Sequence, residues 1–172
     1  AMAAGGVRIL DDSYNSNPRS VRAALLAARE VAERRGARLV VALGDMLELG
    51  DVAAAEHLAM LEAADRVGAD RLLLVGSETA KALALLAKPL ATPNRSFPDA
   101  AAAAAALPEL VAAGDLLLVK GSRGMRMERL IERLEEPAVG IQKAEDAEKA
   151  ESAGNAAPAA RKERPSGSRR KT

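Results

Sequence analysis

Short apolar runs alternate with longer helix-like stretches about five times along this chain, and this alternation constrains the fold more than any other feature. A short, continuous apolar run is typical of a strand that is buried on both faces of a sheet. These runs lie within residues 7–10, 38–43, 71–75 and 115–119, and residues 95–97, in a looser proline-rich connection, are expected to add a short strand. Alternating strands and helices predict an α/β fold of three layers, with a mostly parallel sheet and helices on both faces.

The stretches between these runs predict helices with recognisable ends. Asn17 and Pro18 fit the cap and first position of the first helix, and Gly36 fits its end. Asp51 and Asp99 are predicted to cap the second and fourth helices, the fourth being rich in alanine. The predicted helices cover residues 18–35, 52–67, 77–87, 100–112 and a last segment that follows residue 122.

The composition indicates one domain with an aliphatic core. Of 172 residues, 49% are hydrophobic, but there is one Tyr, one Phe and no Trp. The absence of cysteine excludes disulfides and thiolate metal sites. A net charge of +1 predicts no general affinity for nucleic acid or membrane. No apolar run approaches the roughly 18 residues of a membrane span, so a cytoplasmic protein is expected.

The two ends of the chain differ from the middle. Ala1 precedes Met2 and the first strand follows almost at once, so we expect a fragment of a longer protein. Residues 1–136 are predicted to form the domain. Residues 137–172 lose the apolar periodicity and are predicted to be a disordered tail. Its end, residues 161–171, holds six basic residues, which we interpret as solvated.

Three polar stretches follow predicted strands, at residues 11–17, 44–51 and 120–123. Because right-handed crossovers bring the carboxyl ends of parallel strands to one edge, the three stretches should converge there. The sequence therefore predicts a binding site at this edge. Asp11, Asp12 and other acidic side chains could orient hydroxyl or ammonium groups, although turn-forming aspartates are an equally good reading.

The stretch from Lys120 to Arg123 combines positive charge, a glycine and a hydroxyl where a helix is predicted to begin. Free amides and the helix dipole there favour an anion, either a phosphate or a carboxylate. It is not a Walker A loop. A simple strand-to-helix turn remains the alternative. His57 has no second His or Cys nearby and is interpreted as a packing residue. No nucleophile–base pair is visible, which indicates the binding half of an active site.

The exact amino-acid sequences of these stretches are more specific than the chemistry of their side chains. Residues 11–18 (DDSYNSNP), 43–50 (LGDMLELG) and 119–123 (VKGSR), followed by Met127-Glu128, occur in the same order in a known family. They resemble the C-terminal domain of the Mur ligases, in particular the branch that adds D-Ala-D-Ala. The resemblance covers about residues 6–134. Ser16 stands where that family commonly has Ala, and the tail is not part of the pattern.

The resemblance implies a function in peptidoglycan synthesis. Mur ligases have a domain for the UDP-sugar precursor, a central ATPase domain and a closing Rossmann-like domain. ATP phosphorylates the carboxylate of UDP-MurNAc-tripeptide, and the amine of D-Ala-D-Ala attacks the acyl phosphate. ATP and Mg²⁺ would be bound mainly by domains outside this chain, which would be inactive alone and would contain no catalytic residue.

The resemblance also implies roles for individual residues. The loop from Asp12 to Asn17 should face the adenosine of ATP and the incoming dipeptide. We hypothesise that Lys120, Ser122 and Arg123 hold the dipeptide's carboxylate. The implied substrate- and nucleotide-binding residues are Asp12, Tyr14, Asn15, Asn17, Asp45, Glu48, Lys120, Ser122 and Arg123. The alternatives are a stand-alone α/β module that binds a nucleotide or small anion, and an interaction protein that works through its basic tail.

Overall fold

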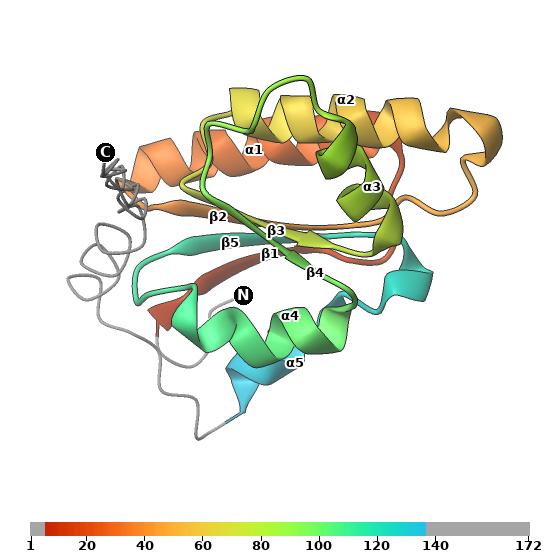
Figure 1. Ribbon diagram of the computed structural model, residues 1–172. Coiled ribbons are helices and arrows are strands. Elements are labelled where there is room, and N and C mark those ends of the chain that lie inside the picture. Colours follow the sequence, from red (N-terminus) through yellow and green to blue (C-terminus); the bar gives the residue numbers. More distant parts are fainter. Residues whose placement is uncertain (1–5, 137–172) are drawn as a thin grey trace, which may run out of the picture.

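The computed structural model describes residues 6–136. The predicted tail and its boundary at residue 137 lie outside this range. Five strands form a single sheet in the order β1-β5-β2-β3-β4, and every neighbouring pair is parallel (Figure 1). The strands are β1 (Arg8–Asp12), β2 (Leu39–Gly44), β3 (Arg71–Val75), β4 (Asn94–Phe97) and β5 (Leu116–Lys120).

Helices cover both faces of the sheet, which confirms the predicted three-layer α/β fold (Figure 1). One apolar cluster joins α1, α2 and α3 to one face, and a second joins α4 and α5 to the other. The α-helices are α1 (Pro18–Arg35), α2 (Ala53–Arg66), α3 (Ser77–Leu85), α4 (Ala100–Ala106) and α5 (Glu128–Glu135). Short 3₁₀ turns lie at Gly50–Val52, Leu107–Glu109 and Arg123–Met125.

The sheet order places the three predicted loops side by side. Strand β5 lies between β1 and β2, with Asp12 opposite Lys120 on one side and Leu43 opposite Lys120 on the other. Because all the strands are parallel, the carboxyl ends of β1, β2 and β5 lie at one edge of the sheet. The predicted convergence of the three loops is therefore present.

The first helix follows its sequence signals closely. The Asn17 side chain accepts a hydrogen bond from the Ser20 amide at 2.9 Å, and the Ser20 hydroxyl accepts one from the Asn17 amide at 3.1 Å. Pro18 occupies the first position, where a missing N–H has no cost. The helix ends at Gly36, whose φ of 61° is the left-handed conformation that glycine adopts without strain.

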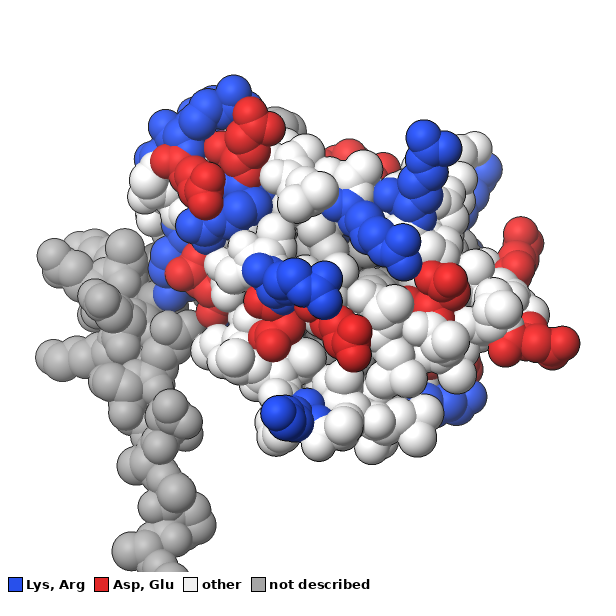
Figure 2. Space-filling model, turned by 90° about the horizontal axis from the view of Figure 1, so that it is seen from above, with Lys and Arg blue, Asp and Glu red and all other residues white. Residues whose placement is uncertain are grey.

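The outer face over α1 and α2 carries charges of both signs. Basic and acidic side chains lie next to one another with uncharged surface between them (Figure 2). Two of the pairs are Arg29 with Glu33, at 2.8 Å, and Arg34 with Glu30, at 3.3 Å. Such a mixed surface lacks the continuous positive field that attracts a phosphate backbone. Within residues 6–136, no helix is both long and apolar enough to cross a membrane.

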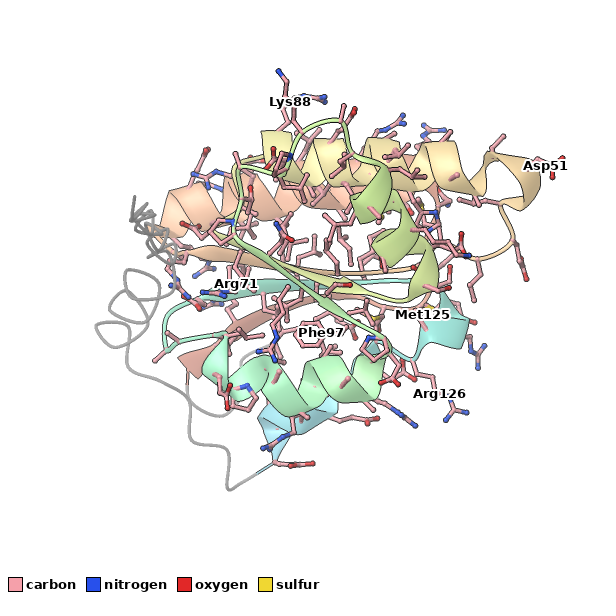
Figure 3. The ribbon with its side chains drawn as sticks, in the orientation of Figure 1. Asp51, Arg71, Lys88, Phe97, Met125 and Arg126 are labelled. Atoms are coloured by element: carbon pink, nitrogen blue, oxygen red, sulfur yellow. The ribbon has the colours of Figure 1, made fainter. Side chains whose placement is uncertain are left out.

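Three predicted helix boundaries are wrong. Asp51 does not cap α2: it lies in the 3₁₀ turn that precedes the helix, projects away from the domain (Figure 3), and leaves α2 without a side-chain cap. Helix α4 ends at Ala106 rather than at residue 112, because Pro108 cannot donate the next helical hydrogen bond. The last α-helix begins at Glu128, after a 3₁₀ turn that ends at Arg126 in a left-handed conformation.

Candidate functional site

A buried lysine ties the first loop to the end of β5. The side chain of Lys120 has no exposed surface, and its ammonium donates to Asp12 Oδ2 and to the carbonyl oxygen of Asn15, both at 2.7 Å. Burying a charge is costly unless it is paired and hydrogen-bonded, and these two partners meet that need. This Lys120 cluster (Asp12, Asn15 and Lys120) fixes the course of the loop between β1 and α1.

The position of Lys120 does not fit the hypothesis that its ammonium meets a carboxylate ligand. The lysine is the last residue of β5 and is enclosed by the chain rather than placed at a helix N-terminus. The hydroxyl of Ser122 is also used internally, since it accepts a hydrogen bond from the Leu47 amide at 2.9 Å. Of the three side chains assigned to this carboxylate, only Arg123 is exposed.

Arg123 lies against the ring of Tyr14 at the surface. Its guanidinium carbon is 5.1 Å from the ring centroid, and Nη1 donates to the Tyr14 hydroxyl at 3.1 Å. Tyr14 is 71% exposed, so this cation–π pair presents a flat face to solvent. The pair forms one side of a pocket of about 400 Å³, which we call the acidic pocket; it is lined by Asp11, Asp12, Ser13, Tyr14, Arg123 and Glu128.

Two motif glycines allow the loops after β2 and β5 to touch. A Cβ on Gly121 would lie 2.6 Å from Met127 Cγ and 3.3 Å from the Gly44 backbone. A Cβ on Gly44 would lie 2.9 Å from Met127 Sδ. The Ser122 amide then donates to the Asp45 carbonyl at 3.2 Å. Side chains at either glycine would force these two loops apart, which explains why the motifs need glycine there.

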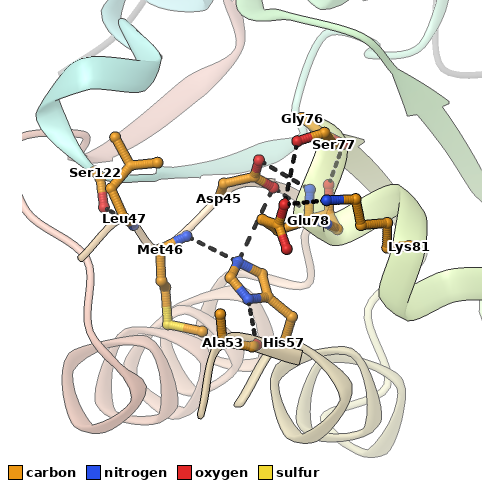
Figure 4. A network of polar contacts seen from close by, with 11 residues as sticks. Asp45, Met46, Leu47, Ala53, His57, Gly76, Ser77, Glu78, Lys81 and Ser122 are labelled. Carbon is orange, nitrogen blue, oxygen red and sulfur yellow. Dashed lines mark hydrogen bonds and ion pairs between the residues drawn. The ribbon is translucent and has the colours of Figure 1, made fainter. Parts of the chain in front are cut away.

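Asp45 stabilises the start of α3 instead of facing a ligand (Figure 4). Its carboxylate accepts from the amides of Glu78, at 3.1 Å, and Thr79, at 2.8 Å, in the manner of an N-cap supplied by another loop. Gly76 makes room for this contact, because a Cβ there would clash with the carboxylate. Asp45 is 3% exposed, so the prediction that it lines an open cleft is not met in this structure.

His57 is a fully buried packing residue that holds the same loop. Its Nε2 accepts a hydrogen bond from the Met46 amide at 3.0 Å, and its Nδ1 lies 2.7 Å from the Ala53 carbonyl oxygen (Figure 4). An accepting Nε2 requires the tautomer whose proton is on Nδ1, which then donates to Ala53. The packing interpretation of His57 is therefore supported, and the side chain is completely buried.

Glu78 and Lys81 form an exposed ion pair beside this network. Lys81 Nζ lies 2.6 Å from Glu78 Oε1. The hydrogen bond from Lys81 holds the pKa of Glu78 below its ordinary value, and the same bond holds the pKa of Lys81 above its ordinary value. Within residues 6–136, no three His, Cys, Asp or Glu side chains gather where they could hold a metal ion.

The nine predicted site residues thus separate into two groups. Four side chains serve the scaffold: Asn17, Asp45, Lys120 and Ser122. The other five are exposed and lie at the carboxyl edge or near it, although Asp12 and the Asn15 carbonyl also bind Lys120: Asp12, Tyr14, Asn15, Glu48 and Arg123. Glu48 is exposed and has a left-handed backbone with φ of 66°. Sequence reasoning missed Arg126, Glu128, Arg129 and Glu132, which lie near Arg123 at the surface.

Comparison with known proteins identifies the family of this domain. Residues 2–123 match the family model of the "Mur ligase, glutamate ligase domain". The chain belongs to the Mur ligase family. The three motif loops that meet at the carboxyl edge all lie within the matched residues.

Several relatives within the family share one name. The chain is 37% identical over 133 residues to UDP-N-acetylmuramoyl-tripeptide–D-alanyl-D-alanine ligase of Escherichia coli (strain K12), which covers 74% of this chain. A crystal structure of MurF from Acinetobacter baumannii matches with a TM-score of 0.64 and 30% identity, and covers 79% of this chain. MurF ligase from Thermotoga maritima, solved in complex with ADP, matches with a TM-score of 0.62, 26% identity and 77% coverage.

The chain spans 27% of the length of the Escherichia coli relative and 29% of each of these two structures. It therefore corresponds to one domain of a Mur ligase, and it aligns with ligases of the branch that the motifs resemble. These matches lend no support to the alternative of a stand-alone, non-catalytic binding module.

Proposed function

We propose that residues 6–136 are the substrate-facing domain of an ATP-dependent ligase that joins D-Ala-D-Ala to UDP-MurNAc-tripeptide through an acyl phosphate. The observation that supports this most directly is the joining of the three motif loops at one sheet edge. There the acidic pocket is lined by Asp12 of the Lys120 cluster and by the Arg123–Tyr14 pair. The close contact between Gly44 and Gly121 holds the second loop against the third.

In this proposal, the chain binds and orients rather than performing chemistry. ATP supplies the phosphoryl group that activates the tripeptide carboxylate, and domains outside residues 6–136 hold its phosphates and Mg²⁺. The flat Tyr14–Arg123 pair fits a nucleobase, since base and guanidinium planes stack well, and Asn15 follows Tyr14 in the same loop. Asp11 and Asp12 face the acidic pocket, where they would attract an ammonium group.

The proposal includes where the protein works and what the isolated chain does. We place it in the bacterial cytoplasm, where the nucleotide-linked precursor and ATP are available. By itself the chain would turn over no ATP, because residues 6–136 contain no Gly-x-x-x-x-Gly-Lys-Ser/Thr stretch that could form a phosphate-binding P-loop. Its partners would be the preceding domains of the same ligase, which bring the activated tripeptide to this pocket.

A domain exchange tests the proposal. The matching domain of the Escherichia coli relative is replaced by residues 6–136, and phosphate release is measured with ATP and UDP-MurNAc-tripeptide, with and without D-Ala-D-Ala. We expect dipeptide-dependent release. The matched control carries Tyr14→Ala and Arg123→Ala in the same chimera and should lose most of it. A folded chimera whose phosphate release does not respond to D-Ala-D-Ala would overturn the proposal.

A further inference from the structure

A second pocket, of about 410 Å³, lies next to the acidic pocket and combines motif residues with residues outside the motifs. We call it the arginine pocket; it is lined by Arg123, Arg126, Glu128, Arg129 and Glu132. The two pockets share Arg123 and Glu128, so they adjoin each other, and we refer to the two together as the depression. Of its three arginines, Arg123 belongs to a motif stretch, whereas Arg126 and Arg129 do not.

The backbone that carries these arginines is compact, with successive turns between Arg123 and Arg129. Arg126 has φ of 52° and ψ of 43°, and its amide donates to the Arg123 carbonyl at 3.1 Å. The Arg129 amide donates in turn to the Arg126 carbonyl at 3.2 Å. A left-handed conformation costs a residue with a side chain about 1–2 kcal/mol, and such positions gather at functional sites. Within residues 6–136, Glu48 and Arg126 are the non-glycine residues with positive φ.

The guanidinium groups of this pocket are available to a ligand. Within the described part of the chain, the side chains of Arg126 and Arg129 make no hydrogen bond or ion pair, and that of Arg123 contacts only Tyr14. All three arginines are exposed. Figure 3 shows Arg126 pointing away from the body of the domain, near Met125. Unpaired guanidiniums present forked donors that match carboxylate and phosphate oxygens.

The two pockets differ in charge, which defines the ligand they fit. Asp11 and Asp12 give the acidic pocket two carboxylates, whereas the arginine pocket carries three guanidiniums against Glu128 and Glu132. A ligand with an ammonium group at one end and a carboxylate at the other fits both halves of the depression. An extended dipeptide spans at most about 7 Å and carries these two charges at its ends.

We propose that Arg126 and Arg129, together with Arg123, form the carboxylate subsite for a zwitterionic dipeptide whose ammonium group faces Asp11 and Asp12. This inference rests on the proposed function and assigns its dipeptide site. It transfers the carboxylate contact from Lys120 and Ser122, which are used by the scaffold, to two arginines outside the motif. In this arrangement a nucleotide would contact the ring face of Tyr14 and not the arginine pocket.

The test is a titration of the ¹⁵N-labelled 172-residue chain, followed by amide chemical shifts. The ligands are D-Ala-D-Ala, its C-terminal amide, its N-acetyl derivative and pyrophosphate. The double variant Arg126→Gly with Arg129→Gln removes both guanidiniums, and the glycine suits the left-handed backbone. The control variant is Arg133→Gln, on the same helix, where Arg133 pairs with Glu136 at 2.8 Å outside the pocket.

We expect the double variant to raise the Kd for D-Ala-D-Ala roughly five- to ten-fold, as for loss of charge-assisted hydrogen bonds. The N-acetyl derivative should lose affinity by the same factor. The amide, which lacks the carboxylate, should bind the wild-type chain weakly and be insensitive to the double substitution. Asp11→Asn should weaken D-Ala-D-Ala but leave the N-acetyl derivative unchanged, and Arg133→Gln should change neither.

Three results would overturn the inference. One is an unchanged Kd for D-Ala-D-Ala in the double variant. Another is shifts around Arg126 and Arg129 produced by pyrophosphate and not by D-Ala-D-Ala, which would indicate a nucleotide phosphate instead. The third is no response of the wild-type chain to the dipeptide at millimolar concentration. The domain exchange still decides the proposed function in each case, because a dipeptide-dependent chimera with such a result would keep the function and reject only this subsite.

Discussion

Water reaches the two charged members of the Lys120 cluster unequally. The Lys120 side chain has no exposed surface, whereas that of Asp12 is 48% exposed. A stranded ammonium would therefore remain buried, but a stranded carboxylate could be hydrated. The two ends of this ion pair should contribute differently to the free energy of unfolding, because the cost of a lost partner is set by the burial of the group left behind.

Asp12→Ala should accordingly destabilise the domain more than Lys120→Met. Removing Asp12 leaves the buried ammonium with the Asn15 carbonyl alone, at a cost of about 3 kcal/mol. Lys120→Met keeps most of the side-chain volume and frees Asp12 to solvent, at a cost of about 1 kcal/mol. Urea unfolding of the two variants measures the difference. Equal losses, or a larger loss for Lys120→Met, would contradict the assigned burial.

Arg126 offers a test of backbone strain. Because its φ is 52°, Arg126→Gly should raise the free energy of unfolding by about 1 kcal/mol. The matched control is Arg129→Gly, in the first turn of α5, where glycine should instead lower stability by about 1 kcal/mol. Thermal unfolding of both variants compares the signs. If both variants were stabilised, or neither, the left-handed conformation of Arg126 would not explain the effect of glycine on stability.

At the scale of elements, α3 depends on a side chain from another loop. Asp45→Ala should remove the hydrogen bonds to the Glu78 and Thr79 amides and cost about 1–2 kcal/mol. Hydrogen exchange of the α3 amides should speed up more than that of the other helices. Asp51→Ala is the control, because Asp51 caps nothing in the structure, and it should leave α2 and α3 unchanged. An effect of Asp51→Ala equal to that of Asp45→Ala would reverse the two assignments.

The connection between α2 and β4 should respond to acid. Burial alone would raise the pKa of Asp65, but the backbone amides of Thr92 and Ala91 and the Thr92 hydroxyl donate to it and hold its pKa below the ordinary value. A lowered pKa in the folded state means that this contribution to stability is present above the unfolded pKa of about 3.9 and is lost as pH falls through the folded pKa.

Asp65→Asn should therefore flatten the loss of stability on acidification below about pH 4. The measurement is urea unfolding of wild type and variant between pH 3 and pH 7, with the difference in unfolding free energy plotted against pH. The difference should shrink toward low pH, because the wild-type carboxylate is then protonated. A difference that stays constant over this range would mean that the Asp65 bonds do not depend on its charge.

Periodicity and caps predict the elements well and their boundaries less well. Residues 71–75 were predicted as a strand with the bounds that the structure shows, because a short apolar run between polar turns indicates a buried strand and little else. Helix α4 was predicted too long because alanine continues the pattern while Pro108 ends it. Asp51 was assigned as a cap from residue type alone, yet the chain forms a 3₁₀ turn there and leads into α2 without one.

At the scale of the whole molecule, topology predicted where the site lies but not which side chains face it. The convergence of the three loops follows from parallel strands and needs no side-chain detail. The use of Lys120 and Asp45 within the scaffold could not be predicted, because their partners lie 108 and 33 residues away in the sequence. Arg126 and Arg129 were missed because an exposed arginine on a helix ordinarily faces solvent without further role.

The central position of β5 also sets the order in which the domain can assemble on a ribosome. Strand β1 pairs only with β5 in the described sheet, and β5 is the last strand to be synthesised. Until residue 120 leaves the exit tunnel, β1 and β2 have no shared neighbour, and the acidic pocket has no second side. Long-range parallel pairing of this kind is slow to form. The edge that carries the acidic pocket would therefore form only after residue 120 has been synthesised, well after β1 itself.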